Sequence, residues 1–413
     1  MTNDAGNWEE AQLQKSLAQR AAGGLGAYWV AGRQEPPPVP PIVLTGGIPD
    51  PETLPIEQLI ETSNRVLRES GPDALRYGGQ QGYPGLREWL AEEYSRRDGL
   101  TLTAENFTIT NGISGGLLNV VETFVDAGDV GLTELPTFPS CAGTVQHCMG
   151  EAVGVPMDED GLIPEALAET IGRLEGEGRR VKVLYTIPNF QNPTGFTLPL
   201  ERRHEVVEIC GRHGVLIMED DAYGDIRLEG ERLPSLYSLA GGKGAVYLGT
   251  FSKTVATGLR VGWVLADEPI IAALMRTRYD LGTNPWMQRM MVEFVSNGDW
   301  ERHVEKMIGV YRRKRDMMLA GLDERCSRYA SWNRPEGGFF LWLKLAESVD
   351  PAVLAKAARE QGVAYVGGRA FHYGRGGQQT VRLAFSHVSD QEIPEAILRF
   401  GRALEQAAGG AAT

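Results

Sequence analysis

Short apolar runs alternate with helical segments over the middle of the chain, and this pattern constrains the fold more than any other feature of the sequence. Each run is too short for a helix and almost continuously apolar, which is typical of strands buried on both faces of a parallel sheet. We expect strands at 107–110, 130–132, 181–185, 215–218 and 245–248. The segments between them, including a helix at 200–213, would cover both faces of the sheet, which gives an α/β fold.

The length of the chain, 413 residues, predicts more than one domain, because a single hydrophobic core rarely grows so large. A charged helical stretch at 301–326 leads away from the α/β region. Beyond it, strands expected at 338–343, 364–366 and 381–385 and a helix at 351–361 indicate a smaller α+β domain. We therefore assign 1–55 to an N-terminal segment, 56–300 to a large domain and 301–413 to a small C-terminal domain. The N-terminal segment would contain a helix followed by a glycine-rich stretch within 8–32, a proline-rich loop and part of the small domain.

Composition excludes several classes of protein. The net charge of −13 argues against nucleic acid as a partner, since phosphate binding needs a basic face. No apolar run approaches the roughly 20 residues of a membrane span, and the N-terminus lacks the apolar core of a signal peptide. The four cysteines and six histidines form no pattern of metal ligands. We expect a cytoplasmic protein with neither a metal site nor a membrane partner.

Polar residues follow the expected strands at their carboxyl ends, where ligands bind in open parallel α/β sheets. They are Asn111 with a glycine-rich turn, Asn192, Asp220 with Tyr223, and Lys253 with Arg260. One edge of the sheet would therefore carry backbone N–H groups, an amide, a carboxylate, a phenol, an amine and a guanidinium.

Pyridoxal 5′-phosphate (PLP) requires this combination of groups. Its phosphate needs N–H donors at a helix N-terminus and a cation. Its aldehyde reacts with a lysine amine to form a Schiff base. Its pyridine nitrogen needs a carboxylate that keeps it protonated, so that the ring accepts electrons. The sequence therefore predicts a PLP site in which Lys253 holds the cofactor.

Seven motifs extend this prediction over residues 44 to 404: Thr45-Gly-Gly-Ile-Pro-Asp50, Arg76-Tyr-Gly, Gly82-Tyr-Pro-Gly-Leu-Arg87, Gln191-Asn-Pro-Thr-Gly195, Glu219-Asp-Asp-Ala-Tyr223, Gly249-Thr-Phe-Ser-Lys253 with Gly258-Leu-Arg260, and Val381-Arg-Leu383. In this order and spacing they resemble the fold-type I aminotransferases of class I and II, most closely the α-aminoadipate and kynurenine aminotransferase-like subgroup. The resemblance implies a fold-type I PLP-dependent transferase, with a mostly parallel central sheet in the large domain and a smaller α+β domain.

The resemblance also implies the roles of the catalytic residues. Lys253 would hold the cofactor and move the substrate Cα proton, and Asp220 would pair with the pyridine nitrogen. Glu219 and Asp221 are its neighbours, but strand alternation directs Asp220 away from both. Tyr223 and Asn192 would bond the ring oxygen, and Asn192-Pro193 is a candidate cis peptide.

Further residues are implied in binding roles. The phosphate would contact Gly112, Ile113, Ser114, Thr250, Ser252 and Arg260, and Phe138 would stack on the pyridine ring. Arg382 would clamp the substrate α-carboxylate, assisted by Gly46, Gly47 and Asn192. Tyr77 resembles a tyrosine that reaches the phosphate from a second subunit, which implies a homodimer.

The expected reaction moves the α-amino group of an amino acid to a 2-oxo acid. Another PLP reaction on the same scaffold, such as elimination, oxidation or cyclisation, stays open, because fold does not determine reaction type. A ligand-sensing regulator domain is a remote alternative. Transcription factors with this domain carry a basic helix-turn-helix module ahead of it, and only about 45 residues, including the proline run, precede the similarity here. The segment 23–33, with Tyr28 and Trp29, lacks the arginine-bearing pattern associated with α-aminoadipate. Aromatic or aliphatic donors, or a packing role for these two residues, stay open.

Overall fold

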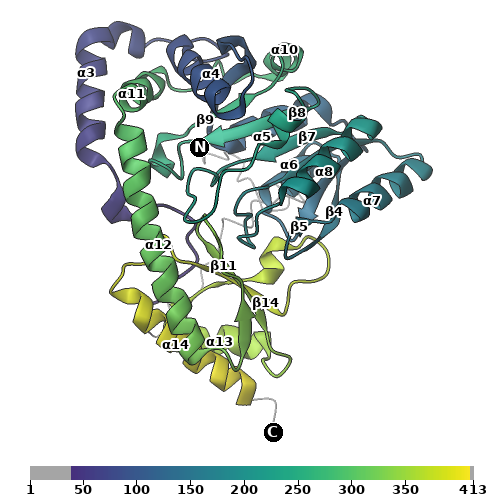
Figure 1. The fold of residues 1–413 in the computed structure, drawn as a ribbon, viewed down its shortest axis with the longest axis vertical. Helices are drawn as coiled ribbons and strands as arrows, with labels where there is room; N and C mark the ends of the chain where they lie inside the picture. The colour runs from purple at the N-terminus through teal and green to yellow at the C-terminus, as the bar shows by residue number, and fades with distance from the viewer. Residues whose placement is uncertain (1–38, 410–413) are drawn as a thin grey trace, which may run out of the picture.

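An eight-stranded sheet forms the centre of the larger part of the molecule (Figure 1), in the order β2-β9-β8-β7-β6-β3-β4-β5. The structure, a computed structural model, describes residues 39–409. The helix and glycine-rich stretch expected within 8–32, with Tyr28 and Trp29, lie outside the described residues. The strands are β2 (Phe107–Asn111), β3 (Val130–Leu135), β4 (Glu151–Asp158), β5 (Gly161–Leu162), β6 (Val181–Thr186), β7 (Leu216–Asp220), β8 (Ala245–Thr250) and β9 (Val261–Leu265).

The strand directions confirm the expected mostly parallel sheet. Strands β4, β3, β6, β7 and β8 run parallel to their neighbours in that series. Strand β9 is antiparallel to both β2 and β8, and β5 is antiparallel to β4. The sequence pattern did not predict β9, because no α-helix separates it from β8 as a parallel crossover would usually require.

Helices cover both faces of this sheet. One face is covered by α5 (Gly112–Phe124), α6 (Ser140–His147) and α10 (Glu268–Thr277). The other is covered by α3 (Ile56–Ala74), α4 (Pro84–Asp98), α7 (Pro164–Gly176), α8 (Leu200–His213), α9 (Leu236–Leu239) and α11 (Pro285–Ser296). Side-chain alternation in the strands separates the two cores. Tyr185 and Met218 belong to the α5 side, and Ile217 belongs to the other.

Helix α12 (Asp299–Arg325) runs from the larger part to the smaller one (Figure 1). There an antiparallel sheet has the order β10-β11-β14-β13 and is covered by helices α13 and α14. These elements are β10 (Ala330–Trp332), β11 (Phe340–Leu345), α13 (Pro351–Gln361), β13 (Val366–Gly367), β14 (Thr380–Ala384) and α14 (Glu392–Gly409). Strand β1 (Ile42–Val43) pairs with β12 (Val363–Ala364), so residues near the start of the described chain complete the small part. None of the helices in residues 39–409 has the length and apolar composition that a membrane span requires.

Candidate active site

Lys253 lies in the turn after β8, beside the loop that follows β1. Its Nζ donates a hydrogen bond to the carbonyl oxygen of Gly47 at 2.8 Å. Burial lowers the pKa of Lys253 to about 8. Asp220 opposes this shift, and the positive charges of Arg382 and Arg260 reinforce it. Part of the amine is therefore neutral near pH 7 and able to attack a carbonyl carbon.

Asp220 is the last residue of β7, and its side chain is only 6% exposed. Its Oδ2 accepts a hydrogen bond from the Tyr185 hydroxyl at 2.7 Å, and its Oδ1 accepts one from the backbone N–H of Ala222 at 3.2 Å. Burial raises the pKa of Asp220 to about 6, while both hydrogen bonds act to lower it. The carboxylate is therefore held ionised mainly by neutral donors.

The two neighbouring acids have other partners. Glu219 accepts the backbone N–H of Tyr237 at 3.0 Å. Asp221 accepts a hydrogen bond from the Asn189 amide at 2.9 Å and another from the Tyr247 hydroxyl at 2.5 Å. Asp220 is thus the acid of this group that contacts Tyr185 on the α5 side of the sheet.

Arg382 projects from β14 and is held on several sides. Its Nη1 donates to Oδ1 of Asn192 at 2.7 Å, and its Nη2 donates to the carbonyl oxygen of Thr45 at 2.7 Å. Its guanidinium carbon lies 4.3 Å from the ring centroid of Phe340 and 4.8 Å from that of Phe371. The two rings and two acceptors fix the direction of the guanidinium, which suits bidentate binding of a carboxylate.

Asn192 also connects Arg382 to Tyr223. The Asn192–Pro193 peptide bond is cis, as the sequence predicted. A side-chain hydrogen bond joins Asn192 to Tyr223, whose pKa is raised by burial. The Tyr223 phenol therefore stays protonated, and its ring centroid lies 5.9 Å from Nζ of Lys253. An amide and a neutral phenol are both available as donors beside the lysine.

Gly112 begins helix α5, and Arg260 lies directly over it. Gly112 has a φ of +66°, and a Cβ built on it would lie 2.8 Å from Nη2 of Arg260. That nitrogen donates to the carbonyl oxygen of Asn111 at 3.0 Å, and the Asn111 side chain does not cap the helix. Free N–H groups in the first helical turn next to a guanidinium form an anion site of the kind that binds phosphate.

The remaining predicted residues lie around these groups. Ile113 and Ser114 follow Gly112 in α5, and Gly46 precedes the carbonyl that binds Lys253. Oγ1 of Thr250 lies 2.9 Å from Oγ of Ser252, and both side chains are buried. Phe138, between β3 and α6, packs against the core that contains Tyr185. Lysine, carboxylate, ring-oxygen donors and anion site together fit the chemistry of PLP.

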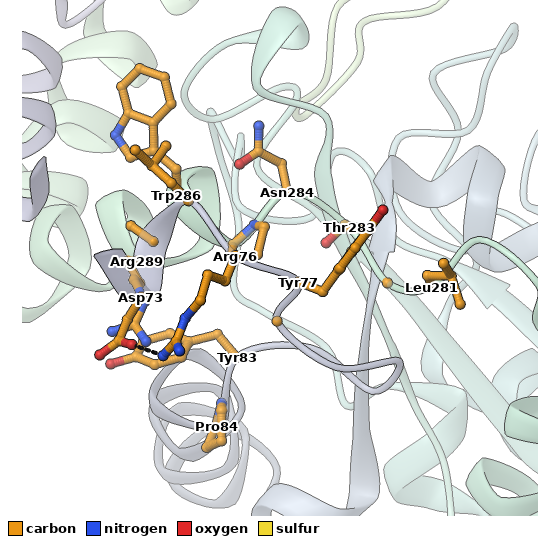
Figure 2. A pocket seen from close by; sticks show the side chains of 15 residues that line it. Asp73, Arg76, Tyr77, Tyr83, Pro84, Leu281, Thr283, Asn284, Trp286 and Arg289 are labelled. Carbon is orange, nitrogen blue, oxygen red and sulfur yellow. Dashed lines mark hydrogen bonds and ion pairs between the residues drawn. The ribbon is translucent and has the colours of Figure 1, made fainter. Parts of the chain in front are cut away.

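Tyr77, like Ser114 and Arg260, is exposed in the single chain. It is 88% exposed and lines a pocket of about 1240 Å³ between the loops at 73–84 and 281–289. Figure 2 shows Tyr77 and Leu281 in this pocket. No other predicted site residue lines it. A second pocket, of about 470 Å³, is lined by Asn111 and Arg260 and shares Gly282, Thr283 and Asn284 with the first.

Residues that contact the site and were not predicted include Tyr185, Phe340 and Phe371. Tyr185 ends a buried apolar run, and a buried tyrosine hydroxyl usually has a hydrogen-bond partner. That position could have indicated a polar neighbour. For Phe340 and Phe371 the sequence contains no comparable signal, because their contact with Arg382 depends on tertiary packing.

Comparison with known proteins agrees with this chemistry. Residues 41–400 match the family model described as aminotransferase class I and II. An aromatic-amino-acid aminotransferase of Thermococcus litoralis is 35% identical over 88% of this chain and 88% of that protein. A 2-aminoadipate transaminase of Thermus thermophilus is 34% identical over 87% and 89%. The crystal structure of a Pyrococcus horikoshii kynurenine aminotransferase in complex with PMP superposes with a TM-score of 0.87 and 30% identity, over 95% of this chain and 98% of that chain.

Proposed function

Because this chain belongs to the class I and II aminotransferases, we propose that the residues around Lys253 bind PLP and an amino acid in the roles expected from the sequence. The protein is a PLP-dependent aminotransferase whose substrates are amino acids and 2-oxo acids. Bound PLP supplies an aldehyde that takes up the amino group and a ring that accepts electrons. One observation carries the residue assignment: the buried Lys253 amine, which has a lowered pKa, is close enough to Asp220, Arg260 and Arg382 for their charges to act on it, and Arg382 is itself fixed by Asn192.

Lys253 and Asp220 would act on protons. The neutral Lys253 amine would hold the cofactor and, when the amino acid takes its place, would remove the proton from the substrate Cα. Asp220 would keep a proton on the pyridine nitrogen, since a buried carboxylate stabilises a positive charge beside it. Tyr223 and Asn192 would donate to the ring oxygen.

The anion site would hold the phosphate. Arg260, Thr250 and Ser252 would contribute side chains, and Gly112, Ile113 and Ser114 would contribute the N–H groups at the start of α5. Phe138 would cover the ring. Within the proposed anion site, Gly112 and Arg260 are the furthest apart in sequence, and they meet because β2 pairs with β9.

Arg382 would bind the substrate α-carboxylate. Its two terminal nitrogens already contact Asn192 and Thr45, so the guanidinium is oriented before substrate arrives. The backbone at Gly46 and Gly47 lies beside it, and a Cβ on Gly47 would come within 2.5 Å of the Phe340 ring. Glycine therefore allows this loop to approach the clamp closely.

The direct test of these roles is Lys253→Ala. The variant should lose the visible absorbance of a lysine-bound cofactor and should lose transamination of any amino donor. Lys243→Ala, at an exposed position before β8, is the matched control and should keep both. A Lys253→Ala protein that retains the absorbance would refute the assignment of the lysine.

We also propose that the active unit is a homodimer in which Tyr77 reaches the phosphate of the other subunit. Leu75, Tyr77, Tyr279 and Leu281 are each more than 60% exposed and lie on the two loops around the large pocket or next to them. Apolar exposure on this scale is typical of an interface. The pocket adjoins the one lined by Arg260, which supports the proximity of an interface to the phosphate site.

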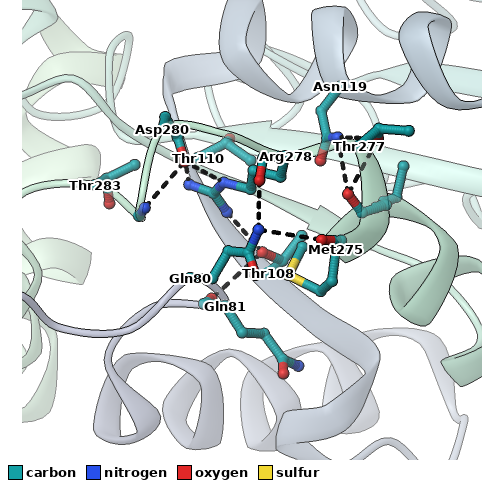
Figure 3. Close-up of polar contacts among 12 residues, drawn as sticks. Gln80, Gln81, Thr108, Thr110, Asn119, Met275, Thr277, Arg278, Asp280 and Thr283 are labelled. Atoms are coloured by element: carbon teal, nitrogen blue, oxygen red, sulfur yellow. Dashed lines mark hydrogen bonds and ion pairs between the residues drawn. The ribbon is translucent and has the colours of Figure 1, made fainter.

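The loop that carries Tyr77 is held in place within the chain. Figure 3 shows the Gln80 amide donating to the carbonyl oxygens of Met275 and Arg278, and Arg278 donating to Oγ1 of Thr108 at 2.9 Å. Arg278 also pairs with Asp280 at 2.7 Å. These contacts fix the loop before any partner binds, so association would need little ordering of the chain.

Mixed dimers test the role of Tyr77. Lys253→Ala and Tyr77→Ala proteins should each be impaired, but a mixture that exchanges subunits should regain activity. A mixed dimer would contain one site with the intact Lys253 of one chain and the intact Tyr77 of the other. If Tyr77 served its own chain, the mixture would gain no activity.

We also propose the substrates, the cellular location and the domain division of this protein. The names of the relatives suggest aromatic amino acids, 2-aminoadipate and kynurenine as first amino donors, to be tested with 2-oxoglutarate and pyruvate as acceptors. We propose a cytoplasmic location. We also propose the division of the chain at residues 55 and 300, which is supported by an apolar core formed mainly by residues before 55 and after 300, with Phe190, Tyr223, Ile226 and Leu228 packed into it from the large part.

A further inference from the structure

Tyr185 lies beneath the proposed site, where its side chain contacts Asp220. It stands near the end of β6 and is fully buried. It is paired across the strands with Met218, and both project to the face covered by α5 and α6, as does Asp220 two residues further along β7. From there its hydroxyl donates to Oδ2 of Asp220 at 2.7 Å.

Few other groups act on the Asp220 carboxylate. The backbone N–H of Ala222 is its second hydrogen-bond donor. Asp221 is the next residue along the chain, Lys253 faces Asp220 from the turn after β8, and the buried Glu134 of β3 is a further acid close enough to interact with Asp220 and Tyr185. The Cys141 thiol of α6 lies near both Asp220 and Tyr185, and burial keeps it protonated by raising its pKa. The Tyr185 hydroxyl is thus the side-chain donor bonded to this carboxylate.

A carboxylate and a pyridine nitrogen that face each other share one proton. The proton rests on the more basic of the two. A hydrogen bond donated to the ionised carboxylate stabilises that form and makes the carboxylate less basic. The same bond therefore moves the shared proton toward the ring nitrogen, where the positive charge lets the ring accept electrons.

We propose that Tyr185 is a positioning residue for the reaction, because its hydrogen bond to Asp220 keeps the shared proton on the ring nitrogen of the cofactor. This inference rests on the proposed PLP site. Two observations support it besides the 2.7 Å contact: burial makes Asp220 more basic, so that its pKa is raised to about 6, and the Tyr185 hydrogen bond acts against that shift.

The test uses the full-length protein loaded with PLP labelled with ¹⁵N in the ring. The nitrogen chemical shift distinguishes a protonated ring from a neutral one, independently of activity. In the unmodified protein the signal should be that of a protonated ring. In Tyr185→Phe it should move toward the neutral position. Tyr373→Phe is the matched control, because its hydroxyl contacts Oγ1 of Thr133 at 2.7 Å in the same region, and it should leave the signal unchanged.

Kinetics give a second readout. Tyr185→Phe should lower kcat about tenfold, which corresponds to about 1.4 kcal/mol in the barrier, and should leave KM within about twofold. An unchanged ¹⁵N signal together with an unchanged kcat would overturn the inference. Asp220→Asn separates this outcome from failure of the site itself. If Asp220→Asn also leaves the signal unchanged, the assignment of Asp220 is wrong.

A tyrosine analogue covers the case in which the phenylalanine variant does not fold. Incorporation of 3,5-difluorotyrosine at position 185 keeps the ring and the hydroxyl but makes the hydroxyl a stronger donor. The nitrogen signal should then stay at the protonated position. A shift toward the neutral position would overturn the inference in a folded protein.

Discussion

The lowered pKa of Lys253 predicts how the cofactor-free protein captures PLP. Only the neutral amine attacks the aldehyde. With a pKa of about 8 in place of 10.5, the neutral fraction at pH 7 is about 9% instead of about 0.03%, a gain of roughly 300-fold. The rate of PLP capture should rise about tenfold per pH unit below pH 8 and should level off above it.

The assay mixes cofactor-free protein with excess PLP and follows the visible absorbance between pH 6.5 and 10. Two variants test the physical cause of the break at pH 8. Asp220→Asn removes a negative charge that favours the protonated amine, so the break should move to lower pH. Arg382→Met removes a positive charge, so the break should move to higher pH. A rate that climbs through pH 10 without a break would refute the reasoning.

Three further substitutions have defined outcomes. Arg382→Lys loses one of two hydrogen bonds and the contact with two rings, so KM for the amino donor should rise at least about tenfold. The absorbance of the bound cofactor should not change. Steady-state kinetics and absorbance spectra measure these two outcomes. Gly112→Ala puts a side chain at a φ of +66° and 2.8 Å from Arg260, so titration should show weaker PLP binding than in Gly211→Ala, a control at an open helical position. Lys314→Met leaves Asp50 buried without its cation and should lower the free energy of unfolding by about 3–5 kcal/mol, as measured by denaturant titration. Lys356→Met, at an exposed position, is the control and should leave the free energy of unfolding unchanged.

Much of the fold could be predicted because its signals are local. The helix expected at 200–213 is observed as α8 with the same bounds, since Pro199 precedes it and Gly214, at a φ of 65°, ends it. The helix expected at 351–361 is observed as α13, with Asp350 accepting the backbone N–H groups of its first turn. Strand β9 was missed because no α-helix separates it from β8, and because its other partner, β2, lies far earlier in the chain.

Some residues of the candidate site could likewise be predicted from local sequence, and others could not. Lys253, Asp220 and Asn192 could be selected because each follows an apolar strand, where parallel sheets bind ligands. The rings of Phe340 and Phe371 could not, since one belongs to β11 and the other to a short helical turn after β13. Their distance from Arg382 is set by how the small part folds on itself.

The pairing of β2 with β9 has a consequence for biosynthesis. Residues 111–114 and Arg260 form the two halves of the anion site, and β9 is the last of the eight strands to leave the ribosome. Neither half alone offers both the helix N-terminus and the guanidinium. The chain should therefore gain its affinity for PLP only after some 265 residues have been made and the last strand has inserted between β2 and β8. Cofactor capture would thus mark completion of the sheet, and earlier folding must proceed without stabilisation by the ligand.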